Sequence, residues 1–494
     1  MKDTVSLVGA YYSGKSVLVT GATGFMGKVL IEKFLHSCHD VKAIYVCVRN
    51  SKMGRNRVRE ELPNFHEKIK PISAEFTKPN LAISSEDMEE MLSEVNVIFH
   101  CAATVRFDEP LKDALLLNVM GTQQLLRLAH QMKNLEALIH VSTAYSNCNR
   151  RHIEEVFYPV PVEPKKLLEL VWMDGSLIEA ITPNLIGDWP NTYTFSKALT
   201  EYLIQQEKGD LNVAIIRPSI VGASWQEPFP GWIDNFNNIS GSFVASGKGI
   251  LQTVKCNPAA LADIIPVDLA INLTIAAGWY TAMHRPESPL IFNCTSGNLN
   301  PLCWREIGEN TFEKNPLEKP FRIPNITITS NYLVHQYWTF VHHTIPAFLC
   351  DLHLRLIGKK NYWDDEAIYC LEKAMSHLEY FTSHSWDWSS ENANMLMKEL
   401  NPKDKNVSIF IEALHPHGYL KCVYRFYTDI SASLLSLLCF IRLKTIHCAL
   451  KATLFVIIWC IFTARSKVAQ NLWYFLLNLC YKFFSYARHC TLRH

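Results

Sequence analysis

A tyrosine and a lysine spaced four residues apart are the first residues whose types could do chemistry. Tyr193 and Lys197 lie in a stretch whose apolar pattern predicts a helix, so both side chains are expected on one helix face. An ammonium group beneath the phenol would favour the phenolate and lower the pKa of Tyr193, which would make the phenol a usable acid–base group. Ser142 and Thr143 follow an apolar run upstream, and either hydroxyl could hydrogen-bond a substrate oxygen.

The meaning of this pair depends on the elements that position it, because Tyr-x-x-x-Lys alone is common on helix surfaces. Upstream, the apolar run Val17–Thr20 ends in three glycines spaced G-x-x-G-x-x-G, and an apolar helical pattern resumes at Val29. Glycine permits a tight turn and the close approach of a pyrophosphate, whose charge a helix N-terminus stabilises. The pattern therefore predicts a dinucleotide site. The residues expected to contact the dinucleotide at this turn are Gly21, Thr23, Gly24, Phe25, Met26 and Gly27.

The end of the second apolar run indicates which dinucleotide binds. The run Ala43–Val48 is typical of a parallel strand buried on both faces, and it ends at Arg49. An acidic residue at this place would bind the ribose hydroxyls of NAD, whereas an arginine accommodates the extra phosphate of NADP. We therefore predict NADPH as the cofactor, with Arg49 on its phosphate; a solvated surface charge is the alternative interpretation.

Further apolar runs are expected to complete a doubly wound, parallel α/β sheet of the Rossmann type. These runs are Lys68–Ser73, Val95–Phe99, Ala137–Val141 and Asn212–Pro218. The small residues Ala102 and Ala103 follow the second of them, near the switch point where a cofactor passes close to the chain. Asn118, in the next helical stretch, is a candidate for holding the backbone near the active site; a helix-surface amide is the alternative.

Composition excludes several classes of function. The chain has 494 residues, enough for two or three domains, and a formal net charge of +1, which gives no support to nucleic acid as a partner. Its 15 cysteines include no C-x-x-C pair, so we expect neither a metal site nor a disulfide framework. This cysteine pattern favours a reducing compartment. Met1–Tyr12 holds no apolar signal-peptide region, and the final Leu-Arg-His is not a Ser-Lys-Leu address.

The order of glycine turn, hydroxyl and Tyr-x-x-x-Lys resembles the extended short-chain dehydrogenase/reductase superfamily. The local sequence is similar to the alcohol-forming fatty acyl-CoA reductases over nearly the whole chain, from about Tyr11 onward. The similar segments are Thr20–Lys28 (TGATGFMGK), Ile98–Phe107 (IFHCAATVRF), His140–Tyr145 (HVSTAY), Arg217–Ser224 (RPSIVGAS) and Glu227–Asn235 (EPFPGWIDN).

This resemblance implies a reaction and a catalytic set. Thr143, Tyr193 and Lys197 would be catalytic, the last two also touching the cofactor, and a long-chain acyl-CoA would be reduced to a primary alcohol. Two NADPH would be consumed, through a hemithioacetal and an aldehyde. A sterol dehydrogenase or a nucleotide-sugar epimerase is the rival enzyme. A catalytically silent, membrane-bound NADPH-binding protein is the other alternative, since the segment after Arg49 is shorter than is usual in the family.

The expected domain organisation follows the same order. We predict a reductase domain with substrate insertions over 11–285, a connector over 286–346, a helical C-terminal domain over 347–445 and a membrane-associated tail over 446–494. Within the reductase domain, Arg150–Pro190 is expected to form one wall over the nicotinamide. Trp225–Pro266 is expected to form the opposite wall, so that together they would enclose a long ligand.

The last part of the chain carries three uncharged apolar runs, namely Ile430–Ile441, Ala452–Ala464 and Val468–Tyr481. Each is shorter than the roughly 20 residues that a single membrane span needs. Basic residues flank the last two runs and could snorkel to lipid headgroups. We predict membrane attachment through a span, a hairpin or an in-plane helix. The resemblance implies the peroxisomal membrane with a cytosolic catalytic domain, or alternatively the endoplasmic reticulum.

Overall fold

The computed structural model describes six stretches of the chain: residues 6–48, 67–235, 239–297, 301–311, 325–348 and 365–407. Arg49, the segment that follows it and the three apolar runs of the tail lie outside these stretches, so their predicted roles stay predictions. Over the stretches that are described, no helix has both the length and the apolar character needed to cross a bilayer.

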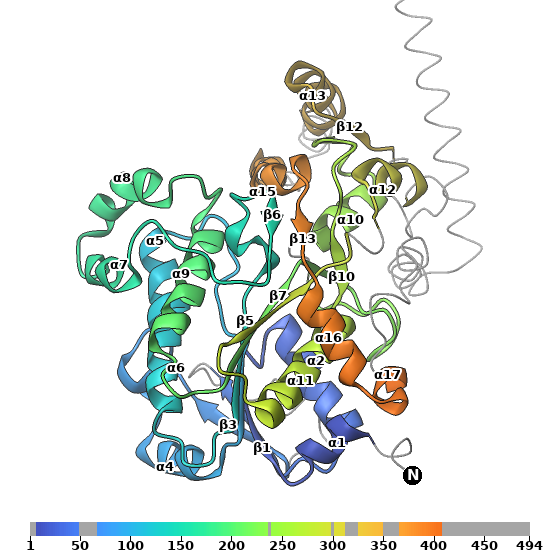
Figure 1. Cartoon of the computed structure of the whole chain (residues 1–494). Helices are drawn as coiled ribbons and strands as arrows, with labels where there is room; N and C mark the ends of the chain where they lie inside the picture. The colour runs from blue at the N-terminus through green and yellow to red at the C-terminus, as the bar shows by residue number, and fades with distance from the viewer. Residues whose placement is uncertain are drawn as a thin grey trace, which may run out of the picture.

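A seven-stranded parallel sheet runs through the centre of the structure, in the order β11-β7-β5-β4-β1-β2-β3 (Figure 1). The order proceeds outward from β1 in both directions, which is the doubly wound arrangement that the sequence predicts. Its strands are β1 (Ser16–Thr20), β2 (Ala43–Val48), β3 (Ile69–Ser73), β4 (Val97–His100), β5 (Ala137–Val141), β7 (Val213–Pro218) and β11 (Leu290–Cys294). The prediction of a Rossmann-type α/β fold is therefore confirmed.

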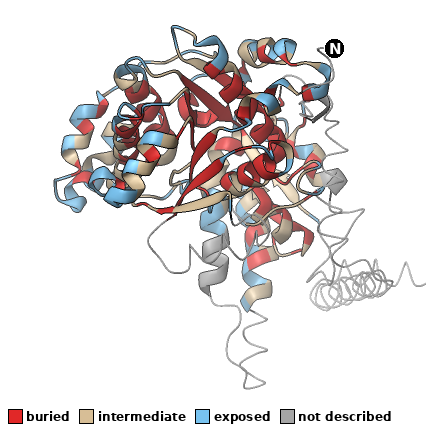
Figure 2. Ribbon diagram, turned by 90° about the horizontal axis from the view of Figure 1, so that it is seen from below, coloured by how far each residue is buried: buried red, intermediate tan, exposed pale blue. Residues whose placement is uncertain are grey.

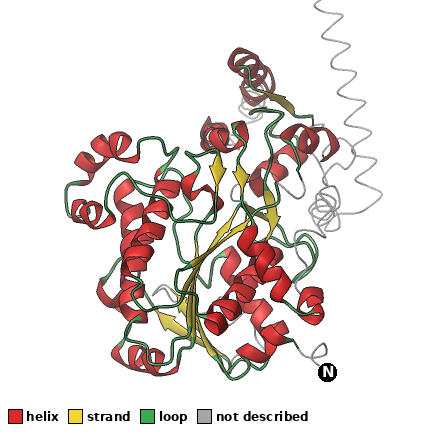
Figure 3. Ribbon diagram, viewed as in Figure 1, coloured by secondary structure: helices red, strands yellow, loops and turns green. Residues whose placement is uncertain are grey.

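Helices cover both faces of this sheet because successive strand residues point to opposite sides. One face packs against α2 (Phe25–Ser37), α11 (Val267–His284) and α16 (Glu391–Glu399). The other face packs against α4 (Ser85–Glu94), α6 (Gly121–Ala129) and α9 (Thr192–Glu207). The sheet consequently lies between two helical layers (Figure 3), and its central strands are buried (Figure 2), whereas the edge strand β3 is mostly half-buried.

Smaller elements surround this frame. Three short parallel strand pairs join β8 (Ile220–Gly222) to β10 (Ile264–Pro266), β9 (Thr253–Lys255) to β12 (Thr327–Thr329), and β6 (His152–Ile153) to β13 (Asp387–Trp388). The remaining α-helices are α1 (Leu7–Tyr12), α5 (Leu111–Ala114), α7 (Pro164–Leu170), α8 (Gly175–Ile186), α10 (Ile239–Gly247), α12 (Trp304–Thr311), α13 (Tyr332–Thr339), α15 (Asp365–Ser383) and α17 (Pro402–Val407). Tighter or wider turns form η2 (Pro79–Ala82), η3 (Leu115–Met120), η4 (Ala144–Asn147) and η5 (Phe340–Thr344).

The described C-terminal segment is helical, as expected, and it packs along the sheet instead of standing apart from it (Figure 1). β13 pairs with β6, which belongs to the stretch between β5 and α9. At the far end, Asp404 of α17 accepts hydrogen bonds from the Ser6 hydroxyl and the Leu7 amide, so it caps α1. The described C-terminal residues 365–407 therefore pack against the domain that contains the seven-stranded sheet.

The glycine turn joins β1 to α2, and its backbone atoms are packed too tightly to admit a Cβ at Gly21 or Gly27. Gly21 has a φ of +69°, which side chains with a Cβ rarely adopt. A Cβ on Gly27 would lie 2.2 Å from the Gly21 carbonyl oxygen, a backbone atom that cannot swing away. Glycine at both positions is therefore what lets α2 begin directly against the end of β1.

We expect Gly27→Ala to destabilise the fold by about 1–3 kcal/mol, because its methyl group would force α2 away from the turn. Urea unfolding would measure this loss, and titration with NADPH would show weakened binding. Gly175→Ala is the matched control, since a Cβ there meets nothing within 4 Å. Equal stability and equal NADPH affinity in both variants would contradict this account of the turn.

Candidate functional site

A cavity of about 940 Å³ lies at the carboxyl ends of the parallel strands. It begins at the glycine turn, passes Thr143 and Tyr193, and ends among apolar side chains. Most of the predicted cofactor residues line it, namely Gly21, Thr23, Gly24, Phe25, Met26, Gly27, Ala102, Ala103 and Tyr193. The fold thus brings together residues that are far apart in the sequence. Lys197 and Asn118 lie behind this lining, and Arg49 is outside the described residues.

The glycine cradle fits a dinucleotide. α2 begins after Gly24 with no side chain capping its first turn, so its first backbone N–H groups can bind a phosphate. A Cβ on Gly21 would come within 2.8 Å of the Ala102 amide nitrogen, so only glycine leaves this edge of the cavity open. These backbone features suit a pyrophosphate, whereas they do not distinguish NAD from NADP.

Asn118 is buried in the π-helical turn η3 and holds the backbone beside the cavity. Its Oδ1 accepts from the Thr104 amide at 2.9 Å, and its Nδ2 donates to the Thr104 carbonyl at 3.3 Å. Nδ2 also lies 2.9 Å from the Ser196 hydroxyl of α9. The interpretation of Asn118 as a residue that holds the backbone is confirmed, and the helix-surface alternative is wrong. A direct contact with the cofactor stays a prediction.

Tyr193 and Lys197 lie on the first turns of α9, which Asn191 caps through a 2.9 Å bond from the Thr194 amide. The Phe107 ring stacks on Tyr193 at 5.7 Å between centroids. Lys197 is buried, and its Nζ donates to the Val141 carbonyl at 2.8 Å, which joins α9 to the end of β5. The structure therefore places Lys197 at the end of β5, next to the strand end that carries Thr143.

The protonation of this pair differs from the expectation. Burial raises the pKa of Tyr193 to about 12, and its hydrogen bond with Thr143 lowers that value only in part. Burial also lowers the pKa of Lys197 to about 8, while Cys101 and Glu201 raise it. The expected lowering of the Tyr193 pKa is therefore wrong for this structure, because desolvation by burial outweighs the hydrogen bond from Thr143. A phenol with this pKa is protonated at neutral pH and can donate a proton.

The structure also separates the two hydroxyls that the sequence left open. Both residues line the cavity, but it is Thr143 that shares a hydrogen bond with Tyr193. Thr143 begins η4, where its hydroxyl accepts from the Tyr145 amide at 3.3 Å. The Ser142 hydroxyl instead donates to the carboxylate of Glu201. Thr143 is therefore the hydroxyl available to a substrate oxygen beside Tyr193.

The walls of the cavity are only partly those predicted. α10 and β9, which lie within Trp225–Pro266, supply one apolar wall, as expected. No lining residue comes from Arg150–Pro190, all of which is described, so the predicted wall there is wrong. The apolar side chains of α7 and α8 pack instead with those of α5 and α9. The second wall comes from α12, β12 and α15, through Ile307, Ile326, Ile328, Met375, Leu378 and Phe381.

Two tryptophans of the C-terminal segment fasten the turn that carries Thr143. Trp386 Nε1 donates to the Cys148 carbonyl at 2.9 Å, and Trp388 Nε1 donates to the Ala144 carbonyl at 3.3 Å. Both rings pack edge-on against Tyr145. The sequence around these tryptophans does not predict their hydrogen bonds to η4, because the bonded residues are more than 200 residues apart in the chain.

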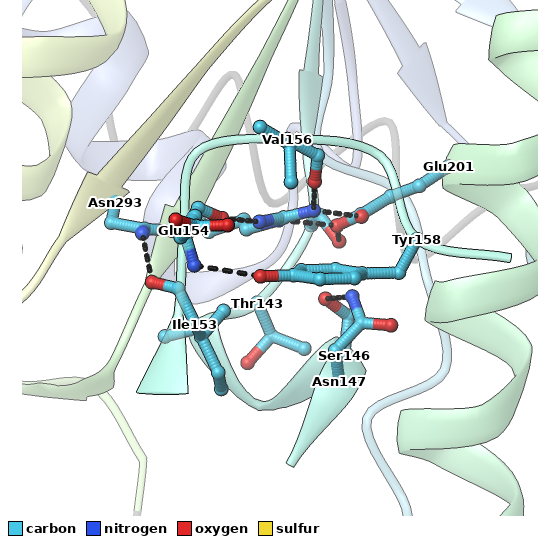
Figure 4. A network of polar contacts seen from close by, with 12 residues as sticks. Thr143, Ser146, Asn147, Ile153, Glu154, Val156, Tyr158, Glu201 and Asn293 are labelled. Atoms are coloured by element: carbon cyan, nitrogen blue, oxygen red, sulfur yellow. Dashed lines mark hydrogen bonds and ion pairs between the residues drawn. The ribbon is translucent and has the colours of Figure 1, made fainter. Parts of the chain in front are cut away.

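Sequence reasoning missed a buried ion pair behind the cavity. Arg217 of β7 and Glu201 of α9 form two hydrogen bonds. Glu154 and Val156 lie close to Glu201 (Figure 4). An arginine ending an apolar strand, and a glutamate one turn beyond Lys197, were the available signals. No cluster of metal-ligating side chains occurs within the described stretches.

Comparison with known proteins shows the family. Sequence models described as male sterility protein match residues 19–274, with an NAD-binding domain, and residues 342–425. Fatty acyl-CoA reductase 1 of Homo sapiens is 51% identical over 97% of this chain and 98% of its own length. Fatty acyl-CoA reductase 1 of Gallus gallus is 52% identical over the same shares, and fatty acyl-CoA reductase 2 of Bos taurus is 49% identical over 98% and 99%.

A solved structure supports the same fold. The terminal R domain from the myxalamid PKS-NRPS biosynthetic pathway superposes with a TM-score of 0.59 at 18% identity, covering 86% of this chain and 93% of that one. The fold, the site and the identity over nearly the full length lead to one conclusion: the chain belongs to the fatty acyl-CoA reductase family, within the extended short-chain dehydrogenase/reductase superfamily.

Proposed function

We propose that this protein reduces long-chain fatty acyl-CoA to the primary fatty alcohol with two NADPH. The observation that carries the proposal is a single cavity that joins the glycine cradle, the Thr143–Tyr193 pair and an apolar wall. Relatives named fatty acyl-CoA reductases support the acyl-CoA substrate. The preference for NADPH over NADH rests on Arg49 and stays part of the proposal.

The chemistry requires two rounds of reduction at one carbon. Bound NADPH supplies the hydride in each round. Thr143 and Tyr193 donate hydrogen bonds to the thioester oxygen, so negative charge developing there is stabilised. The hemithioacetal alkoxide then collapses, re-forms its C=O bond, breaks its C–S bond and expels CoA as the thiolate, which takes a proton from water; an aldehyde remains. In the second round Tyr193 gives its proton to the alkoxide oxygen, and the alcohol forms.

Lys197 does not line the cavity, but its buried ammonium lies near the residues that do. Its bond to the Val141 carbonyl places a buried ammonium at the end of β5, next to the strand end that carries Thr143. We propose that this charge binds the nicotinamide ribose and favours proton release from Tyr193 once the cofactor is held. Positioning and electrostatics are thus what the protein supplies.

Membrane attachment is a further part of the proposal. The three apolar runs between 430 and 481 support it, and so does the surface of α13 and η5. Residues 330–348 contain no Asp, Glu, Lys or Arg, and Leu333, Tyr337, Phe340 and Phe348 are all exposed. Aromatic and aliphatic side chains of this kind suit a lipid interface. We propose the peroxisomal membrane, with the catalytic part in the cytosol, over the endoplasmic reticulum.

An assay of products tests the reaction and its proton donor together. Purified protein with palmitoyl-CoA and NADPH should yield hexadecanol, with less product from NADH. Tyr193→Phe should lower kcat by about 10²–10⁴-fold, because it removes the acid. Tyr202→Phe on the same helix is the control. Full activity of Tyr193→Phe would contradict the acid assignment, and tight NADPH binding without turnover would support the silent alternative.

A series of acyl chain lengths tests the placement of the acyl group. Gly308 of α12 lines the cavity, and a Cβ there would lie 2.8 Å from Ile328 Cδ1. Gly308→Leu should therefore fill the space beyond these residues and lower kcat/KM about tenfold or more for the longest chains, while short chains react normally. Gly175→Leu, on an exposed helix, is the control. An unchanged length profile would place the acyl chain elsewhere.

Cell fractionation and imaging test attachment and location. Leu472→Asp/Leu476→Asp should release the protein from membranes, because buried carboxylates in hydrocarbon are costly. Leu177→Asp/Met283→Asp, at exposed positions of the folded part, is the control. Membrane retention of the tail variant would contradict attachment through the last apolar run. Overlap with a peroxisomal marker, and not with a reticulum marker, is the expected location.

A further inference from the structure

A fully buried ion pair lies directly behind the catalytic hydroxyls. The Arg217 side chain is 0% exposed. Its Nε donates to Glu201 Oε1 at 3.0 Å, and its Nη2 donates to Oε2 at 2.6 Å. Burying two charges is costly unless every remaining donor and acceptor is also satisfied. Because a buried ion pair adds little net stability, we expect the Arg217–Glu201 pair to have a second role.

The other bonds of this pair lead to two further parts of the structure. Arg217 Nη1 donates to the Glu154 carbonyl at 3.0 Å, and Nη2 donates to the Val156 carbonyl at 2.9 Å (Figure 4). Glu201 Oε1 also accepts from the hydroxyl of Ser142. One ion pair therefore links β7, α9, the end of β5 and the loop that follows β6.

Two of the linked elements, the end of β5 and α9, adjoin residues of the proposed reaction. Ser142 directly precedes Thr143, and Glu201 lies one helical turn beyond Lys197 on the same face of α9. Neither Arg217 nor Glu201 lines the cavity, so neither one touches a ligand there. Whatever they contribute to catalysis must act through their neighbours.

We propose that Arg217 and Glu201 are positioning residues, which hold the strand end that carries Thr143 against the helix that carries Tyr193. Thr143 and Tyr193 come from different elements, yet both must reach one oxygen atom. Two side-chain bonds join these elements, from Ser142 to Glu201 and from Lys197 to the Val141 carbonyl. A misplacement of about 1 Å costs about 10²-fold in rate. The inference rests on the proposed acyl-CoA reduction.

The same pair also sets the charge around Lys197. The titratable groups that face this ammonium are Glu201 from α9, His100 and Cys101 from β4, and His140 from β5. Burial lowers the pKa of both histidines and raises the pKa of the Cys101 thiol, so these three groups are neutral near pH 7. Glu201 is the anion among them, and it favours the protonated form of Lys197.

A double substitution separates positioning from simple stability. Replacing a buried ion pair by apolar side chains of similar volume is often neutral for folding, whereas removing one partner is not. Arg217→Met/Glu201→Leu should therefore keep its unfolding midpoint near that of the wild type. Its kcat should fall about 10²-fold, with the KM for palmitoyl-CoA changed less than about threefold. Wild-type kcat in a folded double variant would overturn the positioning role.

A charge-only substitution supplies a second readout that packing does not move. Glu201→Gln keeps the shape of the side chain but removes its charge, so the pKa of Lys197 falls further. If protonated Lys197 is needed, the alkaline limb of kcat/KM should move about one pH unit lower. Glu136→Gln, which removes the partner of Lys15 far from the site, is the matched control. Superimposable pH profiles of the Glu201→Gln variant and the wild type would overturn the inference.

The hydroxyl link gives the mildest test. Ser142→Ala should lower kcat about tenfold, and Ser142→Thr should restore it, because threonine keeps the bond to Glu201. Equal kcat in the alanine and threonine variants would count against the role of this link. Absence of alcohol from the wild type would overturn the proposed function and the positioning role together. A loss of positioning alone leaves the wild type active, so the two failures can be told apart.

Discussion

The parallel register of β1, β4, β5 and β7 is the constraint on which every part of the site depends. Parallel strands bring their carboxyl ends to one edge, where the glycine turn, Ala102, Thr143 and Pro218 meet although they are far apart in the sequence. The register is set by apolar strands buried on both faces, since a slip would move side chains out of both cores. The packing of the core thus sets the relative positions of the site residues.

Buried polar contacts add what the sheet alone cannot supply. The strand ends define an edge, but α9 could slide along it by a fraction of a turn without losing its apolar packing. Lys197 of α9 bonds to the Val141 carbonyl of β5, and Glu201 of α9 bonds to Arg217 of β7. Hydrogen bonds are directional, whereas apolar burial is not, so these contacts select one position of the helix.

The C-terminal segment completes the site instead of forming a separate body. Its α15 supplies Met375, Leu378 and Phe381 to the apolar wall, and Trp386 and Trp388 bond to η4. A long ligand near Tyr193 therefore contacts residues from both matched family segments. The cavity therefore has a backbone-lined end at the glycine turn and an apolar end at α12, β12 and α15.

The sequence by itself determined the doubly wound sheet, the glycine turn and the Tyr193–Lys197 pair. Apolar runs and glycine spacing are local signals, and the local chain settles them before any distant contact forms. Only the tertiary structure decided that Arg150–Pro190 packs away from the cavity, that α15 forms the wall instead, and that the hydroxyl bonded to Tyr193 is that of Thr143, while that of Ser142 bonds to Glu201. It also reversed the expected pKa shift of Tyr193, because burial depends on residues from distant segments. Contacts of this kind depend on three-dimensional packing, which residue spacing does not encode.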